Sequence, residues 1–175
     1  MNALAEVIAH LESRGVVCAL IGGIALGAHG VARATLDVDL LVADRAVLDP
    51  AFWSSSRTVG SPEIRCGDAD DPLVGVVRLT GGPEPIDLIV GHLPWTARIL
   101  ERRLFIHVRG ERLPIVDMAD LILLKLYAAG PQDLVDAQLL LAADPACRTT
   151  VEGRVAEAPR SVRAAWVALQ AKPVA

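Results

Sequence analysis

Residues 16–42 read VVCALIGGIALGAHGVARATLDVDLLV, and this stretch decides the fold. The apolar run 16–21 predicts a strand that breaks at Gly22-Gly23, after which IALGAHG is long enough for about two helical turns. The segment 35–42, TLDVDLLV, has the β-branched and aliphatic content of a second strand, with two carboxylates set into it. Strand, glycine turn, short helix and strand therefore follow one another in this order.

Two aspartates, Asp37 and Asp39, stand on one face of the second predicted strand, because alternate residues of a strand share a face. The opposite face is wholly apolar and is expected to face the core; it carries Val38, Leu40 and Val42. Two neighbouring carboxylates repel each other unless a cation lies between them, and oxygen ligands without His or Cys favour Mg²⁺ or Mn²⁺ over zinc. The alternative is that both only make an exposed strand face soluble. Asp is disfavoured inside strands, yet Asp87 stands in a similar setting in the segment PIDLIV, and this third carboxylate favours a metal site.

Gly22-Gly23 has two interpretations of equal weight. Glycine at a strand-to-helix turn lets the backbone approach a ligand closely, and the free N–H groups of the following helix suit a phosphate. The pair could equally be a tight turn that needs a positive φ. The segment is not a Walker loop, because Ala28 and His29 follow Gly27 where that motif has Lys and Ser or Thr. Arg33 and Thr35 could contact phosphates or brace the loop.

The remaining patterns predict further strands and then helices. Residues 3–14 predict an amphipathic opening helix that stops at Gly15, and EIR, LVGVVRL and PIDLIV predict three strands that extend the sheet in antiparallel fashion. A helix is expected over 95–102, followed by one more strand, LFIHV. Only helices are expected after that strand: one capped by Asp117 that ends at Gly130-Pro131, one from near Asp133, and one or two more with a boundary at Pro159.

These elements predict an α+β fold, a mixed β-sheet flanked by helices. Residues 1–112 are expected to form an α/β core, and residues 113–175 a C-terminal helical segment packed on that core in a single compact unit.

Lys125 shares a helical stripe with apolar residues, so its ammonium group is expected to emerge from a largely buried face. This placement favours a specific anionic partner such as a phosphate. The alternative is a lysine that extends along its stem to solvent or pairs with Asp133 or Asp136. Asp133 itself is explained equally well as a helix N-cap after Gly130-Pro131.

Composition excludes several classes of protein. The chain has 175 residues, 53% hydrophobic and 3% aromatic, with a formal net charge of −4, so neither a base-stacking platform nor a global positive field for nucleic acid is present. Five arginines lie close together with few acidic residues between them and are a candidate RNA patch, although a solvated face is the preferred interpretation: Arg98, Arg102, Arg103, Arg109 and Arg112. The three cysteines are far apart and odd in number, which suits a reducing compartment. No leader or membrane span is expected, so the chain is expected to be cytoplasmic.

The run IGGIALGAHGVARATLDVDLLV resembles the signature of the DNA-polymerase-β-like nucleotidyltransferase superfamily: a glycine pair after a strand, an aspartate pair on the next strand and a third carboxylate on a later one. The segment DLILLKLYAAGPQDLVDAQLL more narrowly resembles the small prokaryotic nucleotidyltransferases of the abortive-infection and toxin–antitoxin type. Gly130-Pro131-Gln132 stand where relatives often carry basic residues. The resemblance covers residues 17–141 and implies a nucleotidyltransferase-like sheet.

The resemblance implies transfer of a nucleoside monophosphate from a nucleoside triphosphate, ATP among the candidates, to an acceptor hydroxyl with release of pyrophosphate. Two Mg²⁺ or Mn²⁺ ions are expected on the metal ligands Asp37, Asp39 and Asp87, with Asp87 on the acceptor side and able to take the hydroxyl proton. Nucleotide binding is assigned to six residues: Gly22, Gly23, Arg33, Thr35, Lys125 and Asp136. Lys125 is also assigned to catalysis, where it would neutralise developing charge.

The acceptor is left open among tRNA, a protein and a small molecule, and a toxin–antitoxin partner protein is an expected companion. A rival function is a non-catalytic, antitoxin-like binding protein that keeps the fold; the retained Asp37, Asp39 and Asp87 favour the enzyme. A Mg²⁺-dependent phosphohydrolase would fit the carboxylates but not the glycine turn. No membrane partner is expected.

Overall fold

The computed structural model describes the chain except for residues 1–2, 57–59, 69–70, 93, 109 and 172–175. Within this part, seven strands form one mixed sheet in the order β3-β4-β5-β2-β1-β7-β6. The strands are β1 (Cys18–Leu20), β2 (Val38–Val42), β3 (Glu63–Cys66), β4 (Gly75–Leu79), β5 (Ile86–Val90), β6 (Leu104–Val108) and β7 (Glu111–Ile115). The α+β class expected from the sequence is confirmed.

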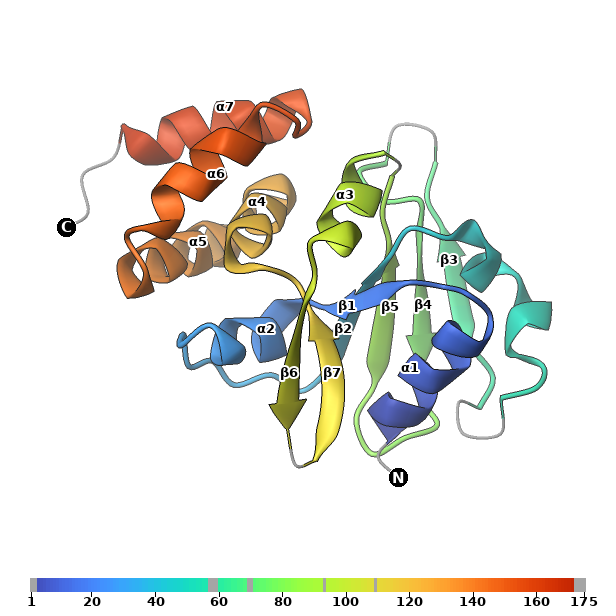
Figure 1. Cartoon of the computed structure of the whole chain (residues 1–175). Helices are drawn as coiled ribbons and strands as arrows, with labels where there is room; N and C mark the ends of the chain where they lie inside the picture. The colour runs from blue at the N-terminus through green and yellow to red at the C-terminus, as the bar shows by residue number, and fades with distance from the viewer. Residues whose placement is uncertain (1–2, 57–59, 69–70, 93, 109, 172–175) are drawn as a thin grey trace.

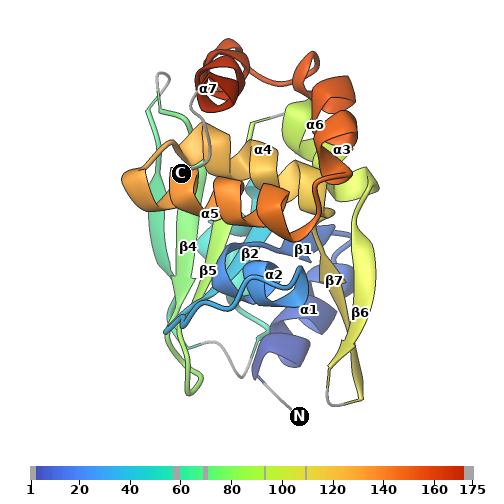
Figure 2. The same cartoon turned by 90° about the vertical axis from the view of Figure 1, so that its left-hand side faces the viewer.

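Helices cover both faces of the sheet. They are α1 (Ala3–Ser13), α2 (Gly22–Ala28), α3 (Trp95–Glu101), α4 (Met118–Ala128), α5 (Pro131–Ala143), α6 (Cys147–Val155) and α7 (Arg160–Gln170), with short 3₁₀ helices η1 (Arg45–Leu48) and η2 (Pro50–Trp53). Helix α1 lies on one side of the sheet, and α2, α4 and α5 lie on the other (Figures 1 and 2). None of the described helices has the length and apolarity that a membrane crossing requires.

The opening stretch forms the predicted elements with shorter strands. Strand β2 begins at Val38, so Asp37 lies in the bend just before the strand rather than inside it. The predicted core face is buried, as Val38, Leu40 and Val42 show. Leu41, on the same face as Asp39, is buried too, because helices cover this second face of the sheet. The carboxylates therefore stand at the margin of a covered surface and not on an open one.

The antiparallel extension of the sheet is confirmed, since β3 pairs with β4 and β4 with β5 in antiparallel register. The expectation that only helices follow β6 is wrong. Residues 111–115, ERLPI, form β7, which joins the sheet between β1 and β6. Two charged residues and Pro114 conceal this strand in the sequence, because proline cannot donate to a strand ladder. The expected division after residue 112 falls inside β7, so the sheet extends to Ile115.

The C-terminal helices begin largely where their caps predict. Helix α4 is capped by Asp117, whose side chain accepts a hydrogen bond of 3.0 Å from the Ala119 N–H. Helix α5 has Gly130 as its N-cap and Pro131 at its first position, so Asp133 lies in the first turn and is not the cap. Pro159 precedes α7, as the predicted boundary requires.

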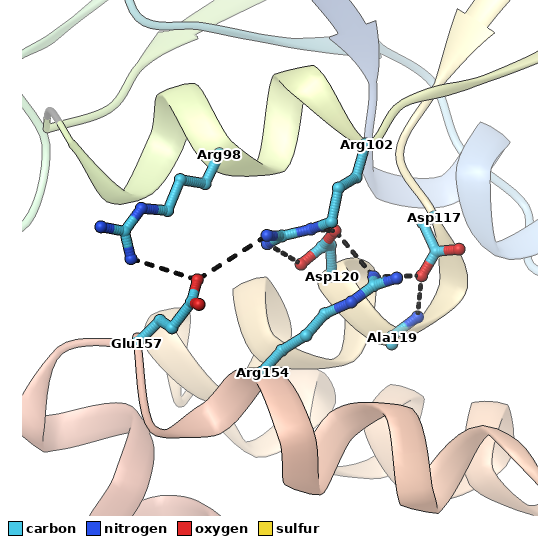
Figure 3. Close-up of polar contacts among 7 residues, drawn as sticks. All are labelled: Arg98, Arg102, Asp117, Ala119, Asp120, Arg154 and Glu157. Carbon is cyan, nitrogen blue, oxygen red and sulfur yellow. Dashed lines mark hydrogen bonds and ion pairs between the residues drawn. The ribbon is translucent and has the colours of Figure 1, made fainter.

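A buried carboxylate ties three helical segments together (Figure 3). Asp120 of α4 is 0% exposed and accepts two hydrogen bonds from Arg102, with Nε at 2.9 Å and Nη2 at 2.8 Å, and one of 2.9 Å from Arg154 of α6. Arg154 also bonds Asp117 at the start of α4. Glu157 lies 3.1 Å from Arg98 and 3.8 Å from Arg102, so α3 and the end of α6 are held to the same face of α4.

Replacing Asp120 with Ala is expected to lower the free energy of unfolding by about 3 kcal/mol, because two arginines lose a fully buried partner. Glu157→Gln removes a half-exposed carboxylate from the same network and is expected to cost less than about 1 kcal/mol. Urea unfolding of both variants measures the difference. Equal stability of Asp120→Ala and Glu157→Gln would show that the buried carboxylate does not anchor these helices.

Candidate active site

The three carboxylates predicted from the sequence come together at one end of β2. Strands β2 and β5 are parallel, and their register places Asp39 directly opposite Asp87. Register partners project from the same face of a sheet, so these two carboxylates stand side by side. Asp37 lies just before β2, and the Thr35 hydroxyl lies 3.0 Å from its Oδ1 and 2.9 Å from its backbone oxygen. Thr35 therefore braces the loop that presents Asp37.

Gly22 lies against the side chain of Asp39. A Cβ atom built on Gly22 would lie 1.9 Å from Asp39 Oδ2, and the φ of Gly22 is +63°, a conformation that favours glycine. A Cβ on Gly23 would lie 2.6 Å from Cβ of Thr35. The glycine pair is thus needed for the close approach of α2 to Asp39 and Thr35, and Gly22 also fits the turn interpretation.

The ionised forms of Asp39 and Asp87 are both disfavoured in this structure. Burial, together with the charges of Asp37 and Asp87, raises the pKa of Asp39 to about 6, against the opposite effect of Lys125 and Arg33. Burial also raises the pKa of Asp87, which Arg78 partly offsets. Repulsion of this kind is what a bound cation would relieve.

Arg78 of β4 was not singled out in the sequence, yet it contacts the site. Its register partner is Asp87, and its Nη1 lies 3.2 Å from Asp87 Oδ2. The sequence could have indicated this contact, because LVGVVRL and PIDLIV were expected to be neighbouring antiparallel strands. Once their register is known, Arg78 lies beside Asp87. The other oxygen, Asp87 Oδ1, is buried without a hydrogen-bond partner.

The donor set fits a hard divalent cation in chemistry. It consists of the carboxylate oxygens of Asp39 and Asp87. One of them, Asp87 Oδ1, is buried without a hydrogen-bond partner, and the surroundings of Asp39 disfavour its ionised form. Among the residues that the structure describes, no group of three or more His, Cys, Asp or Glu side chains is placed so that it could hold a metal ion. The ion pair with Arg78 engages Asp87 Oδ2, so only its Oδ1 is left for such a role.

Lys125 lies among carboxylates of α5. Its Nζ is 2.8 Å from Asp133 Oδ1 and 2.9 Å from Asp136 Oδ2, and the residue is 8% exposed. Asp136 also bonds Arg33 and accepts a 3.1 Å hydrogen bond from Gln132. Burial raises the pKa of Asp136, but the hydrogen bonds from Lys125 and Gln132 outweigh it and hold that pKa below its usual range. Lys125 thus pairs with Asp133 and Asp136, as the alternative interpretation of the sequence allowed, while its contact with a phosphate stays a prediction.

A pocket of about 580 Å³ lies between the sheet and α4. Gly22 and Asp39 line one part of it, and Lys125 and Asp133 line it from the helical side. Its remaining wall is mainly apolar and includes residues that the sequence did not indicate: Leu73, Trp95, Leu121, Leu124, Tyr127 and Pro159. The rings of Trp95 and Tyr127 meet edge to face, with centroids 5.1 Å apart. The volume and the mixture of apolar walls with a few polar groups are typical of a small-molecule site.

The candidate RNA patch consists largely of arginines with partners inside the protein. Arg98 and Arg102 contact Glu157, and Arg103 donates to the backbone oxygen of Leu100 at 2.8 Å. Arg112 stacks 3.4 Å from the ring centroid of Phe105. Arg109 lies outside the described residues. These contacts agree with the preferred interpretation, in which the segment is not an RNA surface.

No protein-family model and no curated protein sequence matches the chain. Solved structures do match it. The solution structure of the antibiotic-resistance factor ANT(2'')-Ia is 15% identical, covers 89% of this chain and 92% of its own, and has a TM-score of 0.55. The crystal structure of ANT(2'')-Ia with adenylyl-2''-tobramycin is 14% identical, covers 95% of this chain and 94% of its own, and has a TM-score of 0.54.

A protein from Thermotoga maritima that was assigned as a nucleotidyltransferase is 11% identical, with 72% of this chain and 82% of its own covered and a TM-score of 0.53. At these identities the likeness establishes a shared fold. The structure therefore has a nucleotidyltransferase-like fold, in which Asp39 of β2 lies opposite Asp87 of β5 and lines the pocket.

Proposed function

We propose that the protein transfers a nucleoside monophosphate from a nucleoside triphosphate to a hydroxyl group and releases pyrophosphate. The observation that carries this proposal is the register of β2 and β5, which sets Asp39 beside Asp87 while Gly22 lies against Asp39. Two further observations support it: the nucleotidyltransferase-like fold, and the presence of Lys125 and Arg33 near enough to Asp39 to lower its pKa.

Asp37, Asp39 and Asp87 would hold two Mg²⁺ or Mn²⁺ ions. When bound, such ions activate the acceptor oxygen and stabilise the leaving pyrophosphate. Asp87 would also accept the hydroxyl proton. Gly22 and Gly23 let α2 approach Asp39 and Thr35 closely. Backbone N–H groups at the start of α2 would hold the β- and γ-phosphates, and Lys125 and Arg33 would neutralise the phosphate charge.

We infer that the acceptor is a small hydroxyl compound. The pocket beside Asp39 has the volume of a small-molecule site, and four arginines of the candidate RNA patch already contact other residues of the protein. A structural neighbour, ANT(2'')-Ia, was crystallised with adenylyl-2''-tobramycin. A tRNA, a protein acceptor or a toxin–antitoxin partner would each need a surface beyond this pocket.

The first test is release of pyrophosphate from each of the four nucleoside triphosphates with Mg²⁺ or Mn²⁺, against a panel of small polyhydroxy compounds, tRNA and a protein extract. Asp39→Asn and Asp87→Asn are each expected to lower the rate by about 10³-fold or more, because each removes a carboxylate from the site. Glu101→Gln, an exposed residue of α3, is the matched control for loss of one charge. Wild-type rates in either aspartate variant would contradict the proposal, as would failure of the folded protein to bind any triphosphate.

Gly22→Ala is expected to abolish most of the activity. The new methyl group would overlap Asp39 Oδ2. The alanine would also have to adopt a positive φ, which costs roughly 1–2 kcal/mol. Gly27→Ala in the same helix is the control, since a Cβ there meets nothing within 4 Å and needs no unusual φ. We expect Gly22→Ala to lose at least about 100-fold in rate and Gly27→Ala to stay near wild type. Equal activity of the two variants would show that Asp39 does not need the space at Gly22.

The raised pKa of Asp39 predicts a pH dependence of stability in protein kept free of divalent metal. Its pKa of about 6 in the folded state exceeds the ordinary 3.8, so ionisation of Asp39 destabilises the fold as pH rises from about 4 to about 6. Asp39→Asn is therefore expected to be more stable than wild type by about 1–2 kcal/mol at pH 7.5 and by less at pH 5. Thermal unfolding in EDTA measures this. A difference that is the same at both pH values would contradict the assigned repulsion.

A further inference from the structure

The two carboxylates that contact Lys125 differ in burial and in bonding. Asp136 is 1% exposed, and both of its oxygens are engaged, Oδ2 by Lys125 and Arg33 and Oδ1 by Gln132. The Asp133 side chain is 26% exposed, lines the pocket together with Asp39, and bonds Lys125 through Oδ1 at 2.8 Å. Asp136 is thus a fixed part of the interior, while Asp133 stands at the pocket surface.

The charges around Lys125 cancel, which affects how an anion can bind there. Lys125 and Arg33 are the cations, and Asp133 and Asp136 are the anions, so the four side chains together are neutral at pH 7. A phosphate group can gain the full attraction of Lys125 only when one carboxylate leaves it. Breaking the bond to Asp136 would strand a buried charge, which is costly, whereas Asp133 can turn towards water.

We propose that Asp133 is an internal counter-ion that the triphosphate displaces from Lys125, and that Asp136 is a positioning residue that holds Lys125 at the pocket and binds Arg33. This inference rests on the proposed function and adds a competitor to the phosphate site. It follows that Asp133 weakens phosphate binding, and that its return to Lys125 assists the departure of pyrophosphate. Gly130 fits this arrangement, since a Cβ there would lie 2.9 Å from Asp133 Oδ2.

The test measures binding of inorganic tripolyphosphate and of each nucleoside triphosphate to Asp133→Asn by calorimetry, with Mg²⁺ present. The amide keeps the size of the side chain but removes the charge that competes for Lys125. We expect 3- to 10-fold tighter binding, the range set by loss of one partly exposed ion pair. Glu101→Gln removes one charge from an exposed site on α3 and is expected to change the affinity by less than about 2-fold.

A double-mutant cycle with Lys125→Gln separates local competition from a general charge effect. In the Lys125→Gln background, Asp133→Asn is expected to give no gain, because the cation for which phosphate and carboxylate compete is absent. An equal gain in both backgrounds would overturn the proposal and would assign the effect to net charge. Thermal unfolding of each variant checks that the fold is kept.

Steady-state kinetics distinguish a counter-ion role of Asp133 from a purely structural one, because a structural role would not change KM and kcat in the pattern expected here. Asp133→Asn is expected to lower KM for the triphosphate without raising kcat, because phosphate binding improves while pyrophosphate leaves more slowly. Asp136→Asn is expected to act in the opposite direction, with weaker binding by about 10-fold or more. If wild type binds triphosphate and Asp133→Asn binds it no tighter, the counter-ion role fails and the proposed function stands. If wild type binds neither triphosphate nor tripolyphosphate, the proposed function fails first, and the counter-ion role fails with it.

Discussion

The parallel pairing of β2 with β5 is the constraint on which the site depends. It sets Asp39 opposite Asp87 on one face of the sheet, and the bend before β2 brings Asp37 to the same end. Burial and the neighbouring charges of Asp37 and Asp87 disfavour the ionised form of Asp39, and its pKa is raised for both reasons. Burial of the apolar residues on the opposite face of β2 offsets this unfavourable free energy, since Val38, Leu40 and Val42 hold the strand in the core.

The positive side of the site comes from a different part of the chain. Lys125 lies on α4, whose position is fixed by the hydrogen bonds between Asp120 and two arginines, Arg102 and Arg154. Asp136 of α5 then sets the direction of Lys125 and Arg33. Stability and function are thereby linked, because helix α4 carries both the fully buried Asp120, which binds two arginines, and Lys125, which lines the same pocket as Asp39. Displacement of α4 would separate the two charged halves of the site.

The sequence predicted the elements whose signals are local. Alternation in TLDVDLLV identified β2 and its core face, and Asp117 identified the start of α4. The glycine pair marked the change from strand to helix, although α2 begins at Gly22 itself and not after the pair. Strand β7 escaped prediction because Pro114 and its charged neighbours lack the usual pattern, and only pairing with β1 and β6 stabilises it. The sequence left the partner of Lys125 undecided, because that contact depends on how α5 packs on α4. It did not predict the contact of Arg78 with Asp87, because that contact depends on the register of a hairpin.

The most direct test of the account is a crystal structure of the protein with Mg²⁺ and a non-hydrolysable triphosphate analogue. We expect metal on Asp39 and Asp87, with the phosphates beside Gly22 and with Lys125 Nζ bonded to a phosphate oxygen in place of Asp133. A bound analogue that lies elsewhere, or metal that leaves Asp39 and Asp87 uncoordinated, would contradict the central claim that this carboxylate pair is a nucleotidyl-transfer site.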